Sequence, residues 1–243
     1  WLACVVMKDV TVIDAWWALG MVLLAVSTYV QTGGAPERKM LLLGLCAAWG
    51  LRLGGYLVWR WRNHGMDRRY KAILGHAQKQ RGWGFAKASL LLVFATQAPL
   101  QFIVSLPVQL GQIDAQPAAL GVVAWIGAGM AVTGILFETI GDWQLTRFKA
   151  DPANKGQVMD RGLWSWTRHP NYFGDFSVWW GLYLIALATT SAWWTVISPI
   201  LMSVLLIRVS GAALLERGMK KRRPGYEEYV RKTSGFFPRP PRR

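Results

Sequence analysis

Residues 161–175 read R-G-L-W-S-W-T-R-H-P-N-Y-F-G-D and stand directly before a long apolar segment. Part of this pattern has a purely structural explanation, because Pro170 suits the first turn of a helix and basic residues often flank membrane spans. That explanation does not call for an amide, a phenol and a carboxylate on the helix side. We therefore predict a binding site for an anionic cofactor at a membrane face, formed by Arg161, Arg168, His169, Asn171, Tyr172 and Asp175.

Long apolar runs separate the charged residues of this chain. Hydrophobic residues make up 53% of the 243 positions, and several runs exceed the roughly 18 residues that indicate a membrane helix. We predict an all-helical membrane protein with a single domain over 1–243. Its predicted spans lie near 11–31, 40–59, 86–108, 118–141, 171–189 and 194–216, and a further helix ending near residue 7 gives six to seven spans.

The net charge of +15 is distributed unevenly between the loops. Of the 28 Lys and Arg residues, 24 fall in 60–87, 142–169 and 208–243, whereas the alternate loops carry only Arg38 and Lys39. This asymmetry predicts a multi-pass membrane protein with a cytoplasmic C-terminus and a cytoplasmic polar cap. Because the charge stands in blocks between apolar spans, it indicates a lipid bilayer as partner rather than nucleic acid.

The sequence lacks the motifs of soluble cofactor-binding proteins. It contains no G-x-G-x-x-G after a strand and no G-x-x-x-x-G-K-[ST]. The two cysteines, Cys4 and Cys46, match no metal-binding spacing, so we predict buried free thiols and no metal. Three histidines without a nucleophile elbow give no support to a serine hydrolase.

Ionisable residues inside predicted spans are costly to bury and therefore indicate function. One explanation of Asp14 is a buried structural ion pair with Arg52. The alternative is that Asp14 faces a lipid-side pocket, where burial disfavours its charged form, and donates a hydrogen bond to a substrate carbonyl with help from Tyr56. Glu138 and Asp142 end the fourth span four residues apart, and so lie on one helical face.

Basic side chains near the fourth and sixth spans leave two explanations open. The polar side chains of D-W-Q-L-T-R-F-K are either solvated groups at a helix end or ligands for phosphates and a ribose. They are Asp142, Gln144, Arg147 and Lys149. Arg208 lies inside the last predicted span and needs an anionic partner, which is either Glu216 or a ligand phosphate.

The quoted stretch, with D-W-Q-L-T-R-F-K before it and L-L-E-R and G-Y-E-E-Y after it, resembles the bacterial branch of the steroid 5α-reductase family. The resemblance runs from V-I-D-A-W-W to G-F-F-P and is strongest over 138–237. It implies a helical membrane fold of seven spans, NADPH as hydride donor, and reduction of a carbon–carbon double bond conjugated to a ketone. It also implies that Asp14 holds the substrate ketone and that Trp49 lies near the substrate.

The residue assignments that follow combine this resemblance with the polar positions above. Asp142, Lys149, Asn171 and Tyr172 match the family's cofactor motif. The predicted cofactor-binding set is Glu138, Asp142, Lys149, Arg161, Arg168, His169, Asn171, Tyr172, Asp175, Arg208 and Glu216, and the predicted catalytic set is Asp14, Tyr56 and Trp49.

The R-H-P-N-Y motif also resembles the isoprenylcysteine carboxyl methyltransferases, which use S-adenosylmethionine. Two features favour the reductase: NADPH carries three phosphates for the basic residues to bind, and methyl transfer has no obvious use for Asp14. We expect a lipophilic enone such as a 4-ene-3-ketosteroid as substrate, and a monomer or weak homo-oligomer. A membrane methyltransferase and a non-catalytic lipid binder are the alternatives.

Overall fold

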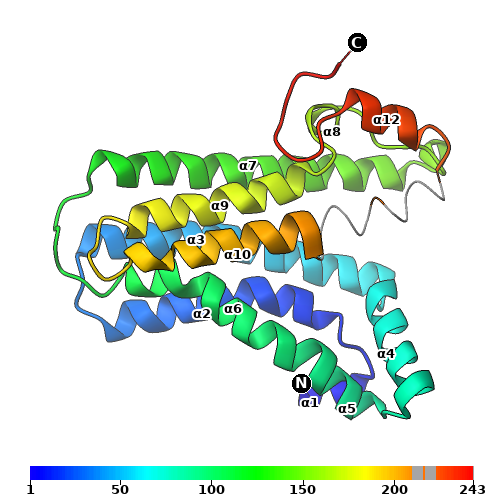
Figure 1. The fold of residues 1–243 in the computed structure, drawn as a ribbon, viewed down its shortest axis with the longest axis horizontal. Helices are drawn as coiled ribbons and strands as arrows, with labels where there is room; N and C mark the ends of the chain where they lie inside the picture. Colours follow the sequence, from blue (N-terminus) through cyan, green and yellow to red (C-terminus); the bar gives the residue numbers. More distant parts are fainter. Residues whose placement is uncertain (210–215, 217–222, 243) are drawn as a thin grey trace. The chain divides into compact units, whose positions relative to one another are not determined.

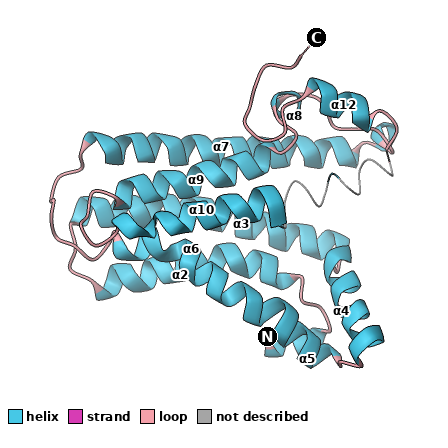
Figure 2. Cartoon of the chain, viewed as in Figure 1, coloured by secondary structure: helices cyan, strands magenta, loops and turns pink. Residues whose placement is uncertain are grey.

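The computed structural model describes residues 1–209, 216 and 223–242, and that part of the chain consists of helices and loops without a strand (Figures 1 and 2). The prediction of an all-helical protein is confirmed for these residues. The chain divides into two compact units, Trp1–Ala118 and Ala119–Arg243. This division does not test the prediction of one catalytic domain.

Among the described residues, four helices are long and apolar enough to cross a membrane: Val12–Gln31, Pro36–His64, Phe85–Leu110 and Val122–Ala150. They occupy the first four predicted spans. The fifth prediction corresponds to α9 (Pro170–Ala186), which has 17 residues, and the sixth to a shorter apolar helix at Trp193–Arg208. The end of the sixth predicted span, 210–215, lies outside the described residues. Six or seven spans and a cytoplasmic cap therefore stay predictions.

The N-terminal unit is built on the antiparallel contact of two long helices. Its helices are α1 (Leu2–Met7), α2 (Val12–Gln31), α3 (Pro36–His64), α4 (Arg68–Arg81), α5 (Phe85–Ser89), the π-helix η1 (Leu90–Phe94) and α6 (Ala95–Leu110). Gly50 and Gly54 of α3 face α2, and a Cβ on Gly50 would lie 2.8 Å from the carbonyl oxygen of Ala18. The close approach of α2 and α3 thus depends on these glycines.

Arg38 and Lys39, the two cations of the loops that are poor in basic residues, are buried rather than solvated. Arg38 is 1% exposed and donates to the carbonyl oxygens of Gly111, Asp114 and Pro117, just after α6. Lys39 donates to the carbonyl oxygen of Thr32, the residue that caps α2. Both side chains therefore satisfy acceptors at helix C-termini, where a positive charge is stabilising.

The C-terminal unit centres on the antiparallel pair α7 (Val122–Ala150) and α9, which run side by side in Figure 1. Its other described helices are the 3₁₀ turn η2 (Pro152–Asn154), α8 (Leu163–Trp166), the 3₁₀ turn η3 (Trp193–Val196), α10 (Ile197–Val204), the π-helix η4 (Leu205–Val209) and α12 (Tyr226–Lys232). The predicted start of a helix at Pro170 is confirmed, because Pro170 is the first residue of α9.

Glycines at seven-residue spacing let the backbones of α7 and α9 touch. Gly127 of α7 faces Gly181 of α9, and Gly134 faces Gly174. A Cβ on Gly134 would lie 2.4 Å from the carbonyl oxygen of Gly174 and 2.8 Å from the amide nitrogen of Val178. Real Cβ atoms do not approach backbone atoms this closely, so only glycine permits the observed contact.

Replacing Gly134 by Val should push α7 and α9 apart. We expect a loss of about 1–3 kcal/mol, the usual cost of overpacking a well-packed contact. Thermal unfolding of the detergent-solubilised protein measures it. Gly129→Val in the same helix is the matched control, because a Cβ on Gly129 meets nothing within 4 Å. Equal effects of the two substitutions would contradict the proposed contact.

Candidate functional site

Buried acidic side chains line the contact between α7 and α9. Glu138 and Asp142 of α7 are 3% and 6% exposed, and Asp175 of α9 is 8% exposed. A Cβ on Gly174 would lie 2.8 Å from the Cβ of Glu138, so the close backbone contact itself brings the acid against α9. The contact of α7 with α9 therefore carries three acidic side chains that are shielded from solvent.

Asn171 joins the two helices at the first turn of α9. Its side-chain nitrogen donates to Oδ1 of Asp142 at 3.4 Å, and its Oδ1 accepts from the amide nitrogen of Tyr172 at 3.1 Å. Tyr172 stacks on His169 with ring centroids 5.5 Å apart and planes 6° apart. The structure thus brings together Asp142, Asn171 and Tyr172, as the family motif implies.

The R-G-L-W segment is held against α7 by two side chains. Gln144 of α7 accepts the amide hydrogen of Leu163 at 3.0 Å. The Nε1 of Trp164 donates to the carbonyl oxygen of Gly141 at 3.0 Å. Gly162 has a φ of +60°, and a Cβ there would collide with the Gln144 amide. The glycine of the motif is therefore explained by local packing.

Arg168, His169 and Glu216 form one ionic network. Nε of Arg168 donates to Glu216 Oε1 at 2.8 Å and Nη2 donates to Oε2 at 3.2 Å. Nε2 of His169 lies 3.0 Å from the same Oε1. Glu216 follows the apolar helix that ends at Arg208. Burial opposes its ionisation, but the hydrogen bonds and charges of His169 and Arg168 outweigh burial and lower its pKa to about 2.

Arg168 also holds the C-terminal tail, which we define as residues 223–242. Its Nη1 donates to the carbonyl oxygens of Val230 at 3.2 Å and Thr233 at 2.9 Å. These contacts fix Arg168 between the tail and Glu216, and His169 is 5% exposed beside them. Arg168, His169 and Glu216 thus connect the tail with the start of α9, and their predicted role in cofactor binding stays a prediction.

The remaining predicted cations are exposed. The side chain of Arg161 is 73% exposed and lies 4.0 Å from Asp160, and Lys149 at the end of α7 is exposed as well. Arg147 lies over the ring of Trp143. Arg208 lies on η4 and is exposed, and its anionic partner, either Glu216 or a ligand phosphate, stays a prediction.

A second polar cluster lies in the N-terminal unit around Asp14. Oδ1 of Asp14 accepts the hydroxyl hydrogen of Tyr70 at 2.5 Å, and Oδ2 accepts from Nη2 of Arg69 at 2.9 Å. Arg60 lies 3.8 Å from Oδ2. The structure thus places Arg69 and Arg60 beside Asp14. Asp14 is the acceptor in both hydrogen bonds, and the Tyr70 phenol and the Arg69 guanidinium are the donors.

Tyr70 is positioned by the start of α4. Asp67 caps this helix, accepting the amide hydrogen of Arg69 at 2.8 Å, and its own amide donates to Oγ1 of Thr11 at 2.9 Å. Tyr70 is 6% exposed, and Nε2 of Gln97 donates to its hydroxyl at 3.3 Å. Burial, and next the charge of Asp14, raise the Tyr70 pKa well above its ordinary value. The phenol therefore keeps its proton at neutral pH.

Trp49 and Tyr56 take no part in the described contacts of Asp14. Trp49 is 1% exposed in the interior of the N-terminal unit, and Tyr56 stacks on Trp59 with centroids 5.9 Å apart. Sequence reasoning missed Tyr70 and Arg69. The signal for them was D-R-R-Y at 67–70, where an N-cap aspartate begins a short amphipathic helix beside the first span.

No group of three or more His, Cys, Asp or Glu residues within the described part of the chain could hold a metal ion. Cys4 and Cys46 are buried free thiols, as predicted.

Comparison with known proteins identifies a family but no activity. A family model described as "Protein of unknown function (DUF1295)" matches residues 1–233. The chain is 24% identical over 233 residues to "Uncharacterized protein C594.04c" of Schizosaccharomyces pombe, a match that covers 84% of this chain. The chain spans 64% of the length of that curated relative. No solved structure matches this chain.

The ionic network predicts a pH-dependent effect of Glu216→Gln. The folded-state pKa of about 2 lies below the ordinary 4.5, so the ionised Glu216 stabilises the protein above pH 4.5, and this contribution is lost as pH falls toward 2. The substitution should lower the thermal unfolding temperature clearly at about pH 5.5 and much less at about pH 3. A decrease of equal size at both pH values would show that the charge of Glu216 is not what matters.

Proposed function

The chain belongs to the family described as "Protein of unknown function (DUF1295)", and we propose that it is a membrane-embedded reductase that uses NADPH to reduce the conjugated double bond of a lipophilic enone. The family description gives no activity, so the proposal is supported by the resemblance of 138–237 to steroid 5α-reductases and by the two polar clusters. It includes a multi-pass arrangement in a bacterial inner membrane with a cytoplasmic C-terminus.

The contact between Asn171 and Asp142 is the observation that carries this proposal. It lies at the α7–α9 contact, with Glu138 buried on the same helical face as Asp142. NADPH presents ribose hydroxyls and a carboxamide, which are donors that buried carboxylates accept. Asn171 can both donate and accept, and Tyr172 supplies an aromatic face. The residues of this contact thus fit the nucleoside parts of NADPH.

Exposed cations near this contact fit the phosphates. Lys149 and Arg147 end α7, and Arg161 begins the R-G-L-W segment that packs on it. All three side chains are exposed, so they are accessible to a charged ligand. Arginine binds phosphate through two parallel hydrogen bonds, and lysine binds it as a point charge. Arg168 is left out of this set, because four of its five N–H groups donate to Glu216 and the tail.

The Asp14–Tyr70 pair fits the carbonyl chemistry. NADPH, when bound, supplies a hydride to the β-carbon of the enone. In the proposal, the Tyr70 hydroxyl turns from Asp14 to donate to the substrate carbonyl oxygen, where negative charge develops. Gln97 continues to donate to the phenol oxygen after this turn, and the raised pKa of Tyr70 keeps the proton on its oxygen. The α-carbon then takes a proton from solvent, which gives the saturated ketone.

A methyltransferase that uses S-adenosylmethionine is the second candidate. The buried carboxylates between α7 and α9 also fit the ribose and ammonium groups of that cofactor. The Asp14–Tyr70 pair favours the reductase, because methyl transfer to a carboxylate needs no proton donor. Purified protein offered NADPH with a 4-ene-3-ketosteroid, and separately labelled S-adenosylmethionine with a lipophilic acid, distinguishes the two. Methyl label in the acceptor without enone-dependent NADPH consumption would overturn the proposal.

Asn171→Ala should weaken NADPH binding by about tenfold or more, the equivalent of about 1.4 kcal/mol, because it removes one polar ligand and the partner of Asp142. Equilibrium binding of NADPH to the detergent-solubilised protein measures this. Asn63→Ala is the control, since the exposed Asn63 bonds only to its own helix at the carbonyl oxygen of Trp59. An unchanged affinity in Asn171→Ala would remove Asn171 from the cofactor site.

Tyr70→Phe should lower turnover by about 100-fold, the usual effect of removing one hydrogen bond to a developing oxyanion. NADPH affinity should stay unchanged, which separates this effect from misfolding. The control is Tyr29→Phe, which removes a phenol at the opposite end of α2 and keeps the ring that Lys39 contacts. Full turnover in Tyr70→Phe would refute the proposed role of the phenol.

A further inference from the structure

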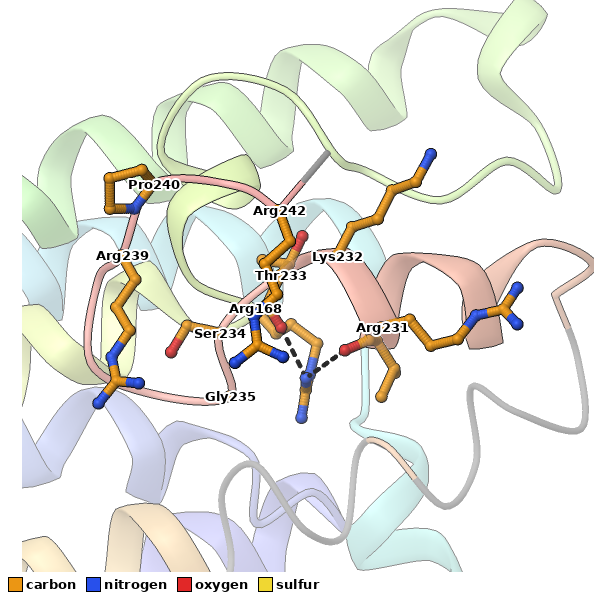
Figure 3. Close-up of a pocket in the computed structure, with 10 residues that line it drawn as sticks. Arg168, Arg231, Lys232, Thr233, Ser234, Gly235, Arg239, Pro240 and Arg242 are labelled. Atoms are coloured by element: carbon orange, nitrogen blue, oxygen red, sulfur yellow. Dashed lines mark hydrogen bonds between the residues drawn. The ribbon is translucent and has the colours of Figure 1, made fainter.

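The C-terminal tail forms a polar cavity of about 260 Å³ that none of the proposed catalytic roles uses (Figure 3). The tail supplies nearly all of its lining, and the loop before α9 supplies Arg168. The charged and hydroxyl side chains that matter here are Arg168, Arg231, Lys232, Ser234, Arg239 and Arg242. Among the described residues, the lining contains five cations and no carboxylate.

Backbone hydrogen bonds hold the tail in place on both sides of the cavity. The amide of Arg168 donates to the carbonyl oxygen of Ser234 at 2.9 Å, and the amide of Arg239 donates to the carbonyl oxygen of Trp166 at 3.0 Å. The amide of Arg242 donates to the carbonyl oxygen of Lys232 at 3.0 Å, which returns the chain to the end of α12. These backbone hydrogen bonds therefore fix the positions of the residues that carry the cationic side chains of the cavity.

The positive charge of the cavity is only partly compensated. Lys232 pairs with Glu228 at 2.7 Å on the surface of α12, and Arg168 pairs with Glu216. Within the described residues, no ion pair involves Arg239 or Arg242. Four of the five N–H groups of Arg168 donate to Glu216, Val230 and Thr233. Within the described part of the chain, no hydrogen bond uses the second hydrogen on Nη2. Gly235 leaves space beside this nitrogen, since a Cβ there would lie 3.3 Å from Nη2.

We propose that this cavity binds a phosphate group. A cluster of arginines without a carboxylate matches the charge and the planar hydrogen-bonding geometry of phosphate oxygens, and Ser234 adds a hydroxyl donor. The volume of about 260 Å³ lies below that of sites for drug-sized ligands, about 300–1,000 Å³, so it suits a single headgroup-sized anion. This site stands independently of the proposed reductase activity.

Two sources of the phosphate are compatible with the site: a free phosphate compound and the headgroup of an anionic phospholipid. The tail carries Phe237, which is 51% exposed and packs edge-on against Phe173 and Phe176 at the start of the apolar α9. An aromatic residue at this position is typical of a membrane boundary, where lipid phosphates lie. The two sources are separated by experiment.

The test uses the whole protein in nanodiscs of phosphatidylcholine. One arm titrates inorganic pyrophosphate by calorimetry, and the other adds phosphatidylglycerol and measures retained lipid by native mass spectrometry. Arg239→Ala/Arg242→Ala and Arg239→Gln/Arg242→Gln remove two charges from the cavity. Lys79→Ala/Lys155→Ala removes two exposed charges elsewhere. Thermal unfolding shows which variants are folded, and the glutamine variant keeps more of the side-chain packing.

The wild-type protein should bind in at least one arm, and each folded cavity variant should bind at least about tenfold more weakly. The lysine variant should bind like the wild type. Binding only of pyrophosphate would assign the site to a free phosphate, and binding only of phosphatidylglycerol to a lipid headgroup. The proposal is overturned by no binding in either arm, by wild-type binding in a folded cavity variant, or by an equal loss in the lysine variant.

Discussion

The close backbone contact of α7 with α9 is the constraint on which the C-terminal unit depends. Gly134 and Gly174 meet without side chains between them, and the same contact brings Glu138 against α9 and Asn171 against Asp142. Packing of small residues allows polar groups of two helices to meet inside an otherwise apolar pair. The glycine contact therefore both stabilises the packing of α7 on α9 and places the residues of the candidate cofactor site.

Charge in this protein serves several separate tasks. Arg38 and Lys39 donate to carbonyl oxygens that follow helices. Arg69 pairs with Asp14, and Arg168 connects Glu216 with the tail. Other cations in the described part of the chain, such as Lys149 and Arg239, lie at the surface. A high net charge is therefore a poor guide to how many residues bind a cofactor, because each buried cation needs acceptors of its own.

The sequence predicts the helices well because long apolar runs and Pro170 are strong local signals. It also places Asp142 and Asn171 together, since the family motif links them. The roles of Arg168 and His169 could not be predicted, because their partners, Glu216 and the tail, lie some 47 to 65 residues further along the chain. Tyr70 was missed for a similar reason: its bond to Asp14 spans 56 residues and depends on how α4 packs beside α2.

The central claim is hydride transfer from NADPH to an enone. It is tested most directly by following deuterium from NADPH labelled at the transferring position of the nicotinamide, with purified protein and a 4-ene-3-ketosteroid. Mass spectrometry of the saturated ketone should find one deuterium, and fragmentation should place it on the former β-carbon. A saturated ketone without deuterium, or no reduced product from a protein that transfers methyl label instead, would contradict the account.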